Sequence, residues 1–460
     1  MSLIHRYKSN GFNIVLDINS GCIHLVDEVT YEVLPYLEEG LGTEAIAEKL
    51  ENKYNREDIE TSVRECNKLK EDGMLFTKDV YENAIEEFSN NRQTVVKALC
   101  LHIAHDCNLA CRYCFAEEGE YHGRRALMSY EVGKKALDFL IANSGSRKNL
   151  EVDFFGGEPL MNWQVVKDLV AYGREQEKLH DKHFRFTLTT NGVLLNDEIM
   201  EFANKEMDNV VLSIDGRKEV HDRMRPFRKG AGSYDLIVPK FQKFAESRHQ
   251  DKYYVRGTYT HFNTDFSKDV LHLADLGFKQ ISVEPVVAQP TDEYALKDSD
   301  LPVLFDEYDR LAAEMVKRNK AGNGFNFFHF MIDLEGGPCV YKRLSGCGSG
   351  TEYLAVTPWG DLYPCHQFVG NEDFLMGNVW DGIKATDIQD EFKCCNVYAK
   401  EKCRNCFARF YCSGGCAANS YNFHGTITDA YDLGCELQKK RIECAIMIKA
   451  AEADMADDAQ

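Results

Sequence analysis

Three cysteines early in the chain have a spacing suited to iron–sulfur chemistry. Residues 107–114 read Cys107-x3-Cys111-x2-Cys114, with Tyr113 just before the last cysteine. A cubic four-iron cluster normally takes four thiolates, so three thiolates leave one iron with an open coordination position. An open position is what a catalytic metal needs, as in a catalytic zinc site. The spacing therefore predicts a catalytic cluster at these cysteines, and the alternatives are a zinc loop or a two-cysteine redox pair.

A second group of cysteines lies in the C-terminal part of the chain. Cys347 and Cys365 flank an expected hairpin that turns at Trp359-Gly360. The run Cys403-x2-Cys406-x5-Cys412-x3-Cys416 follows, and then Cys435. In a reducing compartment such clustered cysteines are more often metal ligands than disulfides. A zinc ribbon over residues 403–435 is the alternative to iron–sulfur clusters.

The remaining cysteines do not fit a ligand pattern. Cys394 and Cys395 are adjacent and cannot easily bind one iron together, and Cys444 lies on an expected helix. We interpret these three as structural. The isolated Cys22, Cys66 and Cys100 are interpreted as small buried hydrophobic residues.

Polar and glycine residues follow several expected strands. Gly156-Gly157-Glu158-Pro159 follows the second strand of the series described below, and its glycines permit close backbone approach. A carboxylate or carbonyl there could accept hydrogen bonds from an ammonium group. Further candidates stand at later strand ends and just beyond: Thr190, Asn191, Ser213, Asp215 and Arg225.

These residues are positioned by a series of alternating strands and helices. The expected strands are residues 96–103, 150–155, 184–190, 210–214, 253–259 and 280–287. The expected helices are residues 129–143, 162–180, 197–204, 233–247, 266–276 and 300–320. Six βα units in series predict a parallel sheet curved into a partial (β/α)6 barrel, an α/β fold. In such barrels the chemistry collects where strands end and loops begin, which is where the motifs fall.

The N-terminal residues predict a separate small unit. Apolar runs at residues 12–17 and 22–26 are joined by Asn19-Ser20-Gly21, which is typical of a hairpin. Helices are expected at residues 28–38, 43–53 and 56–72, the last ending before Gly73. Two strands and three helices indicate a winged-helix-like unit, and the polar stretch 83–93 is interpreted as a linker.

Composition excludes some classes of function. The formal net charge is −20 and the sequence pI is near 5.2, which argues against nucleic acid as the main partner. The N-terminus lacks the apolar segment of a signal peptide, and no apolar run is long enough to span a membrane. We therefore expect a cytoplasmic protein without nucleic-acid or membrane partners.

The three-cysteine loop after a first strand, with the GGEP loop after the second, resembles the radical S-adenosylmethionine (SAM) superfamily. The resemblance implies that the open iron binds SAM, which is cleaved reductively to give a 5′-deoxyadenosyl radical. It assigns the methionine amino group to the loop Gly156, Gly157 and Glu158, the ribose to Ser213 and the carboxylate to Arg225. Tyr113, Thr190, Asn191 and Asp215 are the other expected SAM contacts.

The C-terminal cysteine order resembles the SPASM domain, which adds two auxiliary [4Fe–4S] clusters to radical SAM enzymes. By that resemblance, auxiliary cluster I takes Cys347, Cys365 and Cys416, with Cys339 as a possible fourth ligand. Auxiliary cluster II takes Cys403, Cys406, Cys412 and Cys435. Three [4Fe–4S] clusters and SAM are thus the expected cofactors. Without Cys339, cluster I would have an open iron able to hold a substrate thiolate.

The whole arrangement resembles the maturases of SCIFF peptides, short cysteine-rich precursors made by the ribosome. The domains expected are a leader-peptide recognition domain (1–82), a radical SAM partial barrel (95–321), a SPASM domain (322–445) and an acidic tail (446–460). The resemblance implies thioether crosslinks of the sactipeptide or ranthipeptide kind, with flavodoxin or ferredoxin as reductant. The alternatives are an anaerobic sulfatase maturase, another SPASM peptide maturase such as a quinohemoprotein or mycofactocin type, and an iron–sulfur or zinc regulator that binds DNA.

Overall fold

A computed structural model describes residues 2–85, 87, 89, 92, 94–117, 119–121, 124–332, 334 and 340–457. Cys339, the tentative ligand of auxiliary cluster I, lies outside the described residues. Among the described residues, no helix combines the length and apolar character needed to cross a bilayer.

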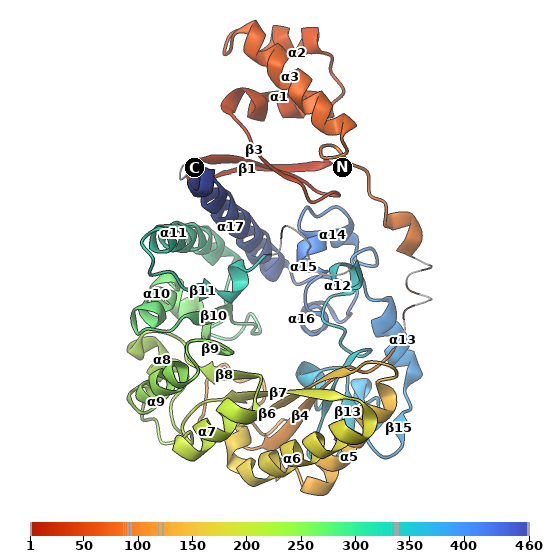
Figure 1. Cartoon of the computed structure of the whole chain (residues 1–460), viewed down its shortest axis with the longest axis vertical. Coiled ribbons are helices and arrows are strands. Elements are labelled where there is room, and N and C mark those ends of the chain that lie inside the picture. The colour runs from red at the N-terminus through yellow and green to blue at the C-terminus, as the bar shows by residue number, and fades with distance from the viewer. Residues whose placement is uncertain are drawn as a thin grey trace.

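The N-terminal unit has three strands where the sequence predicted two. β1 (Ile4–Ser9), β2 (Phe12–Asp17) and β3 (Ile23–Leu25) form an antiparallel sheet in that order. Sequence analysis missed β1 because its middle residues are polar and only its two end residues are buried. The helices α1 (Glu28–Glu38), α2 (Thr43–Leu50) and α3 (Arg56–Glu71) pack beside the sheet around buried Val33, Ile46 and Ile59, and the unit projects from the rest of the molecule (Figure 1).

The central part is the predicted curved parallel sheet. Its six strands are present: β4 (Ala98–His105), β6 (Asn149–Gly156), β7 (His183–Thr190), β8 (Asn209–Ser213), β9 (Tyr253–Tyr259) and β10 (Gln280–Pro285). They lie side by side in this order, each parallel to the next. β4 is buried at every position, as expected for a strand of a parallel sheet covered on both faces.

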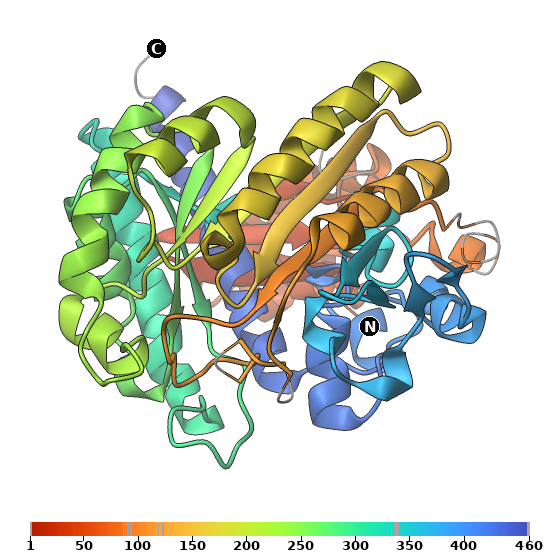
Figure 2. The same cartoon turned by 90° about the horizontal axis from the view of Figure 1, so that it is seen from below.

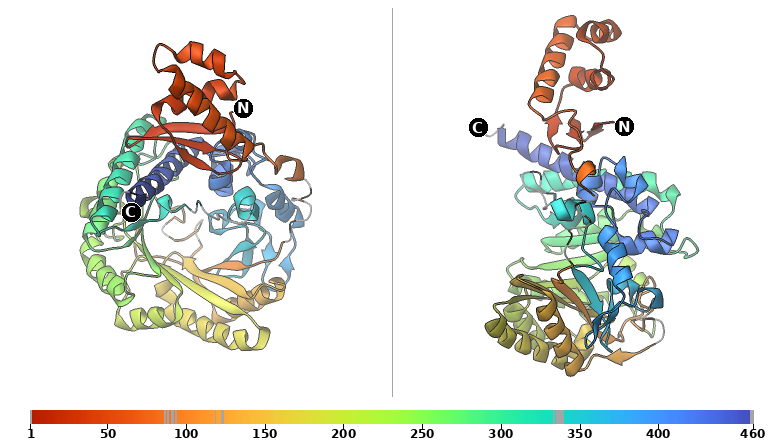
Figure 3. Two further views of the ribbon diagram at one scale, coloured as in Figure 1. Left: turned by 45° about the horizontal axis from the view of Figure 1, so that its top comes forward. Right: turned by 90° about the vertical axis from the view of Figure 1, so that its right-hand side faces the viewer.

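Helices cover the outer face of this sheet (Figures 2 and 3). They are α5 (Tyr130–Asn143), α6 (Trp163–His180), α7 (Asp197–Glu206), α9 (Tyr234–Ser247), α10 (Ser267–Asp275) and α11 (Leu301–Lys320). The sequence did not predict the short helix α8 (Lys218–Met224), which follows β8. Minor elements are β5 (Ala126–Leu127) and the single turns η1 (Glu82–Ala84), η2 (Pro159–Asn162), η3 (His261–Asn263), η4 (Asp298–Asp300), η5 (Phe328–Phe330), η6 (His366–Phe368) and η7 (Glu372–Phe374).

The sheet continues into the C-terminal part of the chain. β12 (Tyr353–Val356) pairs in parallel with β4, on the edge opposite to β6. β13 (Asp361–Tyr363), β14 (Gly377–Asn378) and β15 (Gly382–Ile383) then add antiparallel strands. At the far edge, β11 (Asn326–Phe327) pairs with β10. The expected domain boundary at residue 322 therefore does not interrupt the sheet.

The cysteine-rich segment is folded into short helices and one long one. The short helices are α12 (Val340–Ser345), α13 (Thr386–Cys394), α14 (Glu401–Arg404), α15 (Arg409–Cys412) and α16 (Ala417–His424). The long helix α17 (Asp432–Asp457) packs along α11 and touches β1 and β2. The tail expected from residue 446 onward is thus the second half of α17, in which Met447 and Ile448 are buried.

We predict that Met447→Ala destabilises the protein by about 2–5 kcal/mol, the usual effect of deleting a buried methionine side chain. Lys449→Ala, on the exposed side of the same helix turn, is the matched control and should change stability by at most about 0.5 kcal/mol. Denaturant unfolding of both variants measures the difference. Equal stabilities would show that the end of α17 is not part of the folded core.

Candidate active site

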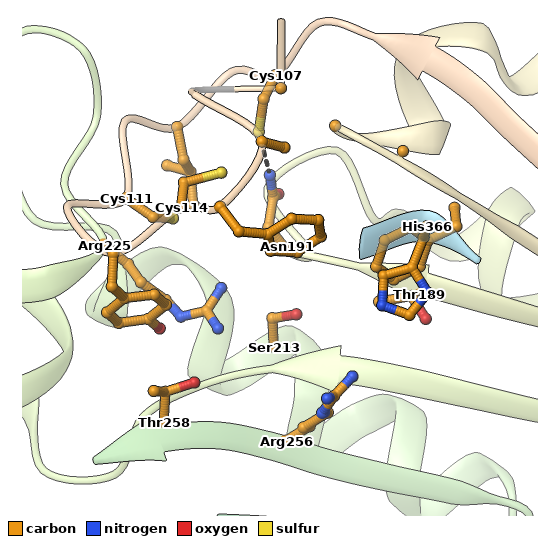
Figure 4. Close-up of a pocket in the computed structure, with 18 of the residues that line it drawn as sticks. Cys107, Cys111, Cys114, Thr189, Asn191, Ser213, Arg225, Arg256, Thr258 and His366 are labelled. Carbon is orange, nitrogen blue, oxygen red and sulfur yellow. Dashed lines mark hydrogen bonds between the residues drawn. The ribbon is translucent and has the colours of Figure 1, made fainter. Parts of the chain in front are cut away.

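The three-cysteine loop follows β4 and forms one wall of a cavity of about 280 Å³. The side chains of Cys107, Cys111 and Cys114 all line this cavity (Figure 4). Burial raises the pKa of Cys107 and of Cys111 to about 12. As free thiols they are therefore protonated at neutral pH, and binding iron as thiolates releases those protons.

The donor set fits a four-iron cluster. Three thiols meet at one cavity, and the Asn191 side chain donates a hydrogen bond of 3.5 Å to Cys107 Sγ. Hydrogen bonds to the sulfurs are a usual feature of such clusters. Within the described part of the chain, no three His, Cys, Asp or Glu side chains form a site for a single metal ion. A cluster does not require that, because each thiolate binds a different iron.

The Gly156-Gly157 loop is held against the start of the cysteine loop. The Gly157 amide donates to the Ala104 carbonyl at 2.7 Å, and the Glu158 amide donates to the Asp106 carbonyl at 2.9 Å. Gly156 has a φ of +116°, and a side chain at Gly157 would collide with the Asp106 backbone. Both glycines line the cavity, so the loop exposes bare backbone to whatever binds there.

Glu158 does not line this cavity, in contrast to its expected contact with SAM. Its fully buried carboxylate accepts hydrogen bonds from the Thr190 hydroxyl, the Asn191 amide and the Leu160 amide, at 2.8–3.0 Å. Burial raises the pKa of Glu158 to about 7, although these three donors lower it. The carboxylate thus fixes the ends of β6 and β7 relative to each other, and Thr190 and Asn191 line the cavity in its place.

A second buried carboxylate organises the opposite wall. Asp215 accepts hydrogen bonds from the Tyr113 hydroxyl, at 2.6 and 2.7 Å, and from Arg225 Nε at 2.9 Å. Asp215 is fully buried and does not line the cavity, whereas Tyr113, Ser213 and Arg225 do. In Figure 4 the Arg225 guanidinium points into the space between the cysteine loop and Ser213. Asp215 therefore orients the arginine and leaves its outer nitrogens to face a ligand.

Sequence analysis missed a group of polar residues on the far side of the cavity. Arg256 on β9 pairs with Glu284 on β10 through two contacts of 3.0 Å, and both line the cavity. Burial raises the pKa of Glu284, but the Arg256 guanidinium outweighs it and lowers that pKa to about 2. Arg256 lies in the middle of β9 and Glu284 lies within β10, so neither residue follows a strand as the predicted site residues do, and no strand-end signal in the sequence marked this pair.

The C-terminal part of the chain closes the cavity. His366, Gln367 and Asn422 line it, and His366 follows directly after Cys365. Burial lowers the pKa of His366 to about 4, so its imidazole is neutral at physiological pH. His366 is therefore a neutral side chain at the cavity wall, next to a cysteine expected at auxiliary cluster I.

The four cysteines expected at auxiliary cluster II line one cavity of about 160 Å³. Cys403 and Cys406 come from α14 and the turn after it, Cys412 ends α15, and Cys435 is in the first turn of α17. Burial, together with the neighbouring Cys435, Cys403 and Cys406, raises the pKa of the Cys412 thiol to about 12. Four mutually close thiols in one cavity fit the donor set of a four-iron cluster.

The cysteines expected at auxiliary cluster I are also close to one another. Burial raises the pKa of the Cys365 thiol, and Cys416 and Cys347 raise it further. Of the cysteines interpreted as structural, Cys395 donates to the Ile427 carbonyl at 3.3 Å, and buried Cys444 lies 3.6 Å from an Asp309 carboxylate oxygen.

Known proteins of similar sequence or fold indicate the class of enzyme to which this site belongs. Residues 101–282 match the Radical SAM superfamily. Radical SAM cyclopropyl synthase TigE of Paramaledivibacter caminithermalis is 22% identical over 411 residues, which cover 81% of this chain and 80% of TigE. The structure of anSMEcpe with bound AdoMet and Kp18Cys peptide has a TM-score of 0.64 at 20% identity, covering 77% of this chain and 99% of that one.

The same fold recurs over almost the whole chain in SuiB of Streptococcus suis. Its structure bound to S-adenosylmethionine has a TM-score of 0.52 at 18% identity and covers 95% of this chain and 99% of SuiB. The matched residues 101–282 contain both the three-cysteine loop and the glycine loop, and the likeness to anSMEcpe and SuiB is one of fold. The match and the relation to TigE support a radical SAM enzyme with SAM and a [4Fe–4S] cluster as cofactors.

We predict that Glu158→Ala destabilises the protein by about 1–3 kcal/mol, because three buried donors lose their acceptor. Glu151→Ala, on the preceding strand β6 and half-exposed, should cost at most about 1 kcal/mol. The melting temperatures of the two variants, measured by thermal unfolding, test this difference in stability. An unchanged melting temperature for Glu158→Ala would contradict the role assigned to this carboxylate.

Arg225→Gln should weaken SAM binding by roughly 10–100-fold, the effect of losing a charge-assisted hydrogen bond of about 1.5–3 kcal/mol. Arg223→Gln removes the same charge from an exposed position two residues away and should leave SAM affinity unchanged. Equilibrium binding of SAM to the anaerobically loaded proteins measures both. Equal affinities would show that Arg225 does not face the cofactor.

Proposed function

We propose that this enzyme forms thioether crosslinks between cysteine thiols and acceptor carbons of a ribosomally made, cysteine-rich precursor peptide. The observation that carries the proposal is the composition of the cavity wall. One side holds the three-cysteine loop, and the other holds His366, next to a cysteine expected at a second cluster. A peptide segment in this cavity would lie between the two.

The SAM site would be formed by Cys107, Cys111 and Cys114 as cluster ligands. The Gly156-Gly157 backbone would face the methionine amino group, and Ser213 and Arg225 would bind the ribose and the carboxylate. When bound, the cluster and SAM supply a 5′-deoxyadenosyl radical that abstracts hydrogen. The enclosing residues, Phe155 and Val286 among them, would exclude water from the reacting carbon.

The N-terminal unit is proposed to bind the leader of the precursor. Among the residues that the structure describes, β3 pairs with one strand only, β2, and is the last strand of its sheet. At the opposite end of the sheet, β1 is held by α17, where Tyr7 donates to the Glu443 carbonyl at 2.9 Å and His5 contacts the Glu443 carboxylate at 2.8 Å. Strand addition at β3 would give main-chain hydrogen bonds to an extended leader.

The proposal includes two auxiliary [4Fe–4S] clusters, three clusters in all. Cluster II would be held by Cys403, Cys406, Cys412 and Cys435, and cluster I by Cys347, Cys365 and Cys416. A peptide ligand also accompanies two relatives, since structures exist of anSMEcpe with a Kp18Cys peptide and of SuiB with precursor peptide SuiA. These ligands support a peptide substrate for this chain.

The overall change at each crosslink is the replacement of one C–H and one S–H bond by a C–S bond, with the loss of two hydrogens. One hydrogen atom would leave with the 5′-deoxyadenosyl group that bound SAM supplies, and the thiol proton would leave to a base or to water. One electron enters from a reductant such as flavodoxin or ferredoxin to cleave SAM, and one is released as the C–S bond forms.

Mass spectrometry of a cysteine-rich precursor coexpressed with the enzyme tests the proposal. We expect a loss of two hydrogens per crosslink and thiols that no longer react with an alkylating agent. A loss of two hydrogens with alkylatable thiols would indicate a carbon–carbon product instead. Formylglycine would indicate a sulfatase-maturase activity.

Cys107→Ala should abolish SAM cleavage and leave retention of the leader peptide unchanged, because the leader site and the cluster loop are on separate parts of the chain. Pull-down with the leader and measurement of 5′-deoxyadenosine check the two effects. Iron analysis of the wild type should give about twelve irons per chain for three four-iron clusters. One or two zincs with retention of DNA would contradict the proposal and support a regulator.

A further inference from the structure

Lys400 is a buried cation without a carboxylate partner among the residues that the structure describes. Its side chain is 2% exposed, and its ammonium donates to the Gly414 carbonyl at 2.9 Å. Within the described ranges, no carboxylate lies within 4.0 Å of this ammonium, whereas buried charges in proteins are normally paired. An anion that is part of the working protein would supply the missing counter-charge.

The turn that holds Lys400 separates the two auxiliary sites. Cys412 and Cys416, at its ends, are expected ligands of cluster II and cluster I respectively. Ser413, Gly414 and Gly415 between them have positive φ values of 58°, 83° and 72°, which makes the turn tight. The aliphatic stem of Lys400 packs beside Gly414, where an added Cβ would lie 3.6 Å from Lys400 Cδ.

Each side of this turn faces a different cavity. Gly414 lines the 160 Å³ cavity together with the four cysteines expected at cluster II. Ser413 and Gly415 line a cavity of about 20 Å³ together with Cys347, expected at cluster I, and with Lys400 itself. Lys400 therefore lines the second cavity and, through its hydrogen bond to the Gly414 carbonyl, contacts a residue that lines the first.

The charge of Lys400 acts on thiols of both sites. Burial raises the pKa of the Cys403 thiol, and the Lys400 ammonium lowers it. Burial likewise raises the pKa of the Cys416 thiol, and Lys400 lowers that pKa as well. Thiolate-ligated clusters are anions whose negative charge grows on reduction, so a fixed buried cation favours the reduced form.

We propose that Lys400 is the shared counter-charge of both auxiliary clusters and raises the reduction potential of each. The inference rests on the proposed function, because it needs the two clusters to be present. In that setting Lys400 biases an electron released by the substrate toward the C-terminal part of the protein. Arg92, also buried and also lining the cavity at Cys347, adds positive charge on the cluster I side only.

The test is an EPR-monitored redox titration in a background that lacks the SAM cluster, Cys107→Ala/Cys111→Ala/Cys114→Ala. We expect Lys400→Met, which is similar in size but uncharged, to shift both auxiliary potentials to more negative values. Lys400→Arg keeps the charge and should retain the parent potentials. Lys384→Met removes an exposed lysine of the same region and should change neither potential.

The iron content of the background protein and of each Lys400 variant, measured beside the potentials, distinguishes failure of the proposed function from failure of the role given to Lys400. A background protein without auxiliary clusters would overturn the proposed function itself. Full iron in Lys400→Met with unshifted potentials, or a shift in only one cluster, would overturn the role of Lys400 alone. Iron loss in Lys400→Met but not in Lys400→Arg supports the counter-charge role, and iron loss in both variants would overturn it, because side-chain shape would then be the requirement.

Discussion

Backbone pairing between β12 and β4 is the interaction on which the arrangement of the site depends. Tyr353 to Val356 pair in parallel with Ala98 to Leu101, two segments about 250 residues apart in the chain. β4 leads into the three-cysteine loop, and β12 turns through β13 into Cys365 and His366. Because the two strands share one sheet, the cysteine-rich part of the chain is held at the mouth of the barrel. A tether through flexible loops alone would not fix that distance.

Two buried carboxylates lie behind the cavity wall and fix the positions of the residues that line it, although neither carboxylate lines the cavity itself. Glu158 joins the ends of β6 and β7, and Asp215 joins Tyr113 to Arg225. Each carboxylate is fully buried and accepts hydrogen bonds from several donors. These hydrogen bonds compensate for the carboxylate's loss of contact with water. Groups that line the cavity are thereby held in one orientation before any ligand binds, which lowers the entropic cost of binding.

The C-terminal helix α17 ties the three parts of the molecule together. It begins beside Cys435, packs along α11 of the barrel and touches the N-terminal sheet at Glu443. In its middle, Arg441 donates to the Tyr308 hydroxyl at 2.8 Å within the barrel wall. The N-terminal sheet therefore rests on an element that also carries Cys435 and packs on the barrel.

The three-cysteine loop and the order of strands and helices in the barrel could be predicted from the amino-acid sequence. Local signals carry these features: the spacing of Cys107, Cys111 and Cys114, and the alternation of apolar strands with amphipathic helices. Which polar groups face the cavity became visible only in the folded chain. Glu158 and Asp215 turn behind the wall, while Arg256, Glu284 and His366 face it, because the direction of a side chain at a strand end depends on the twist and register of neighbouring strands. The β12–β4 pairing escaped prediction because strand pairing across a long separation leaves no periodic mark in either segment. β1 escaped it for a local reason, because its middle residues are polar and only its two end residues are buried.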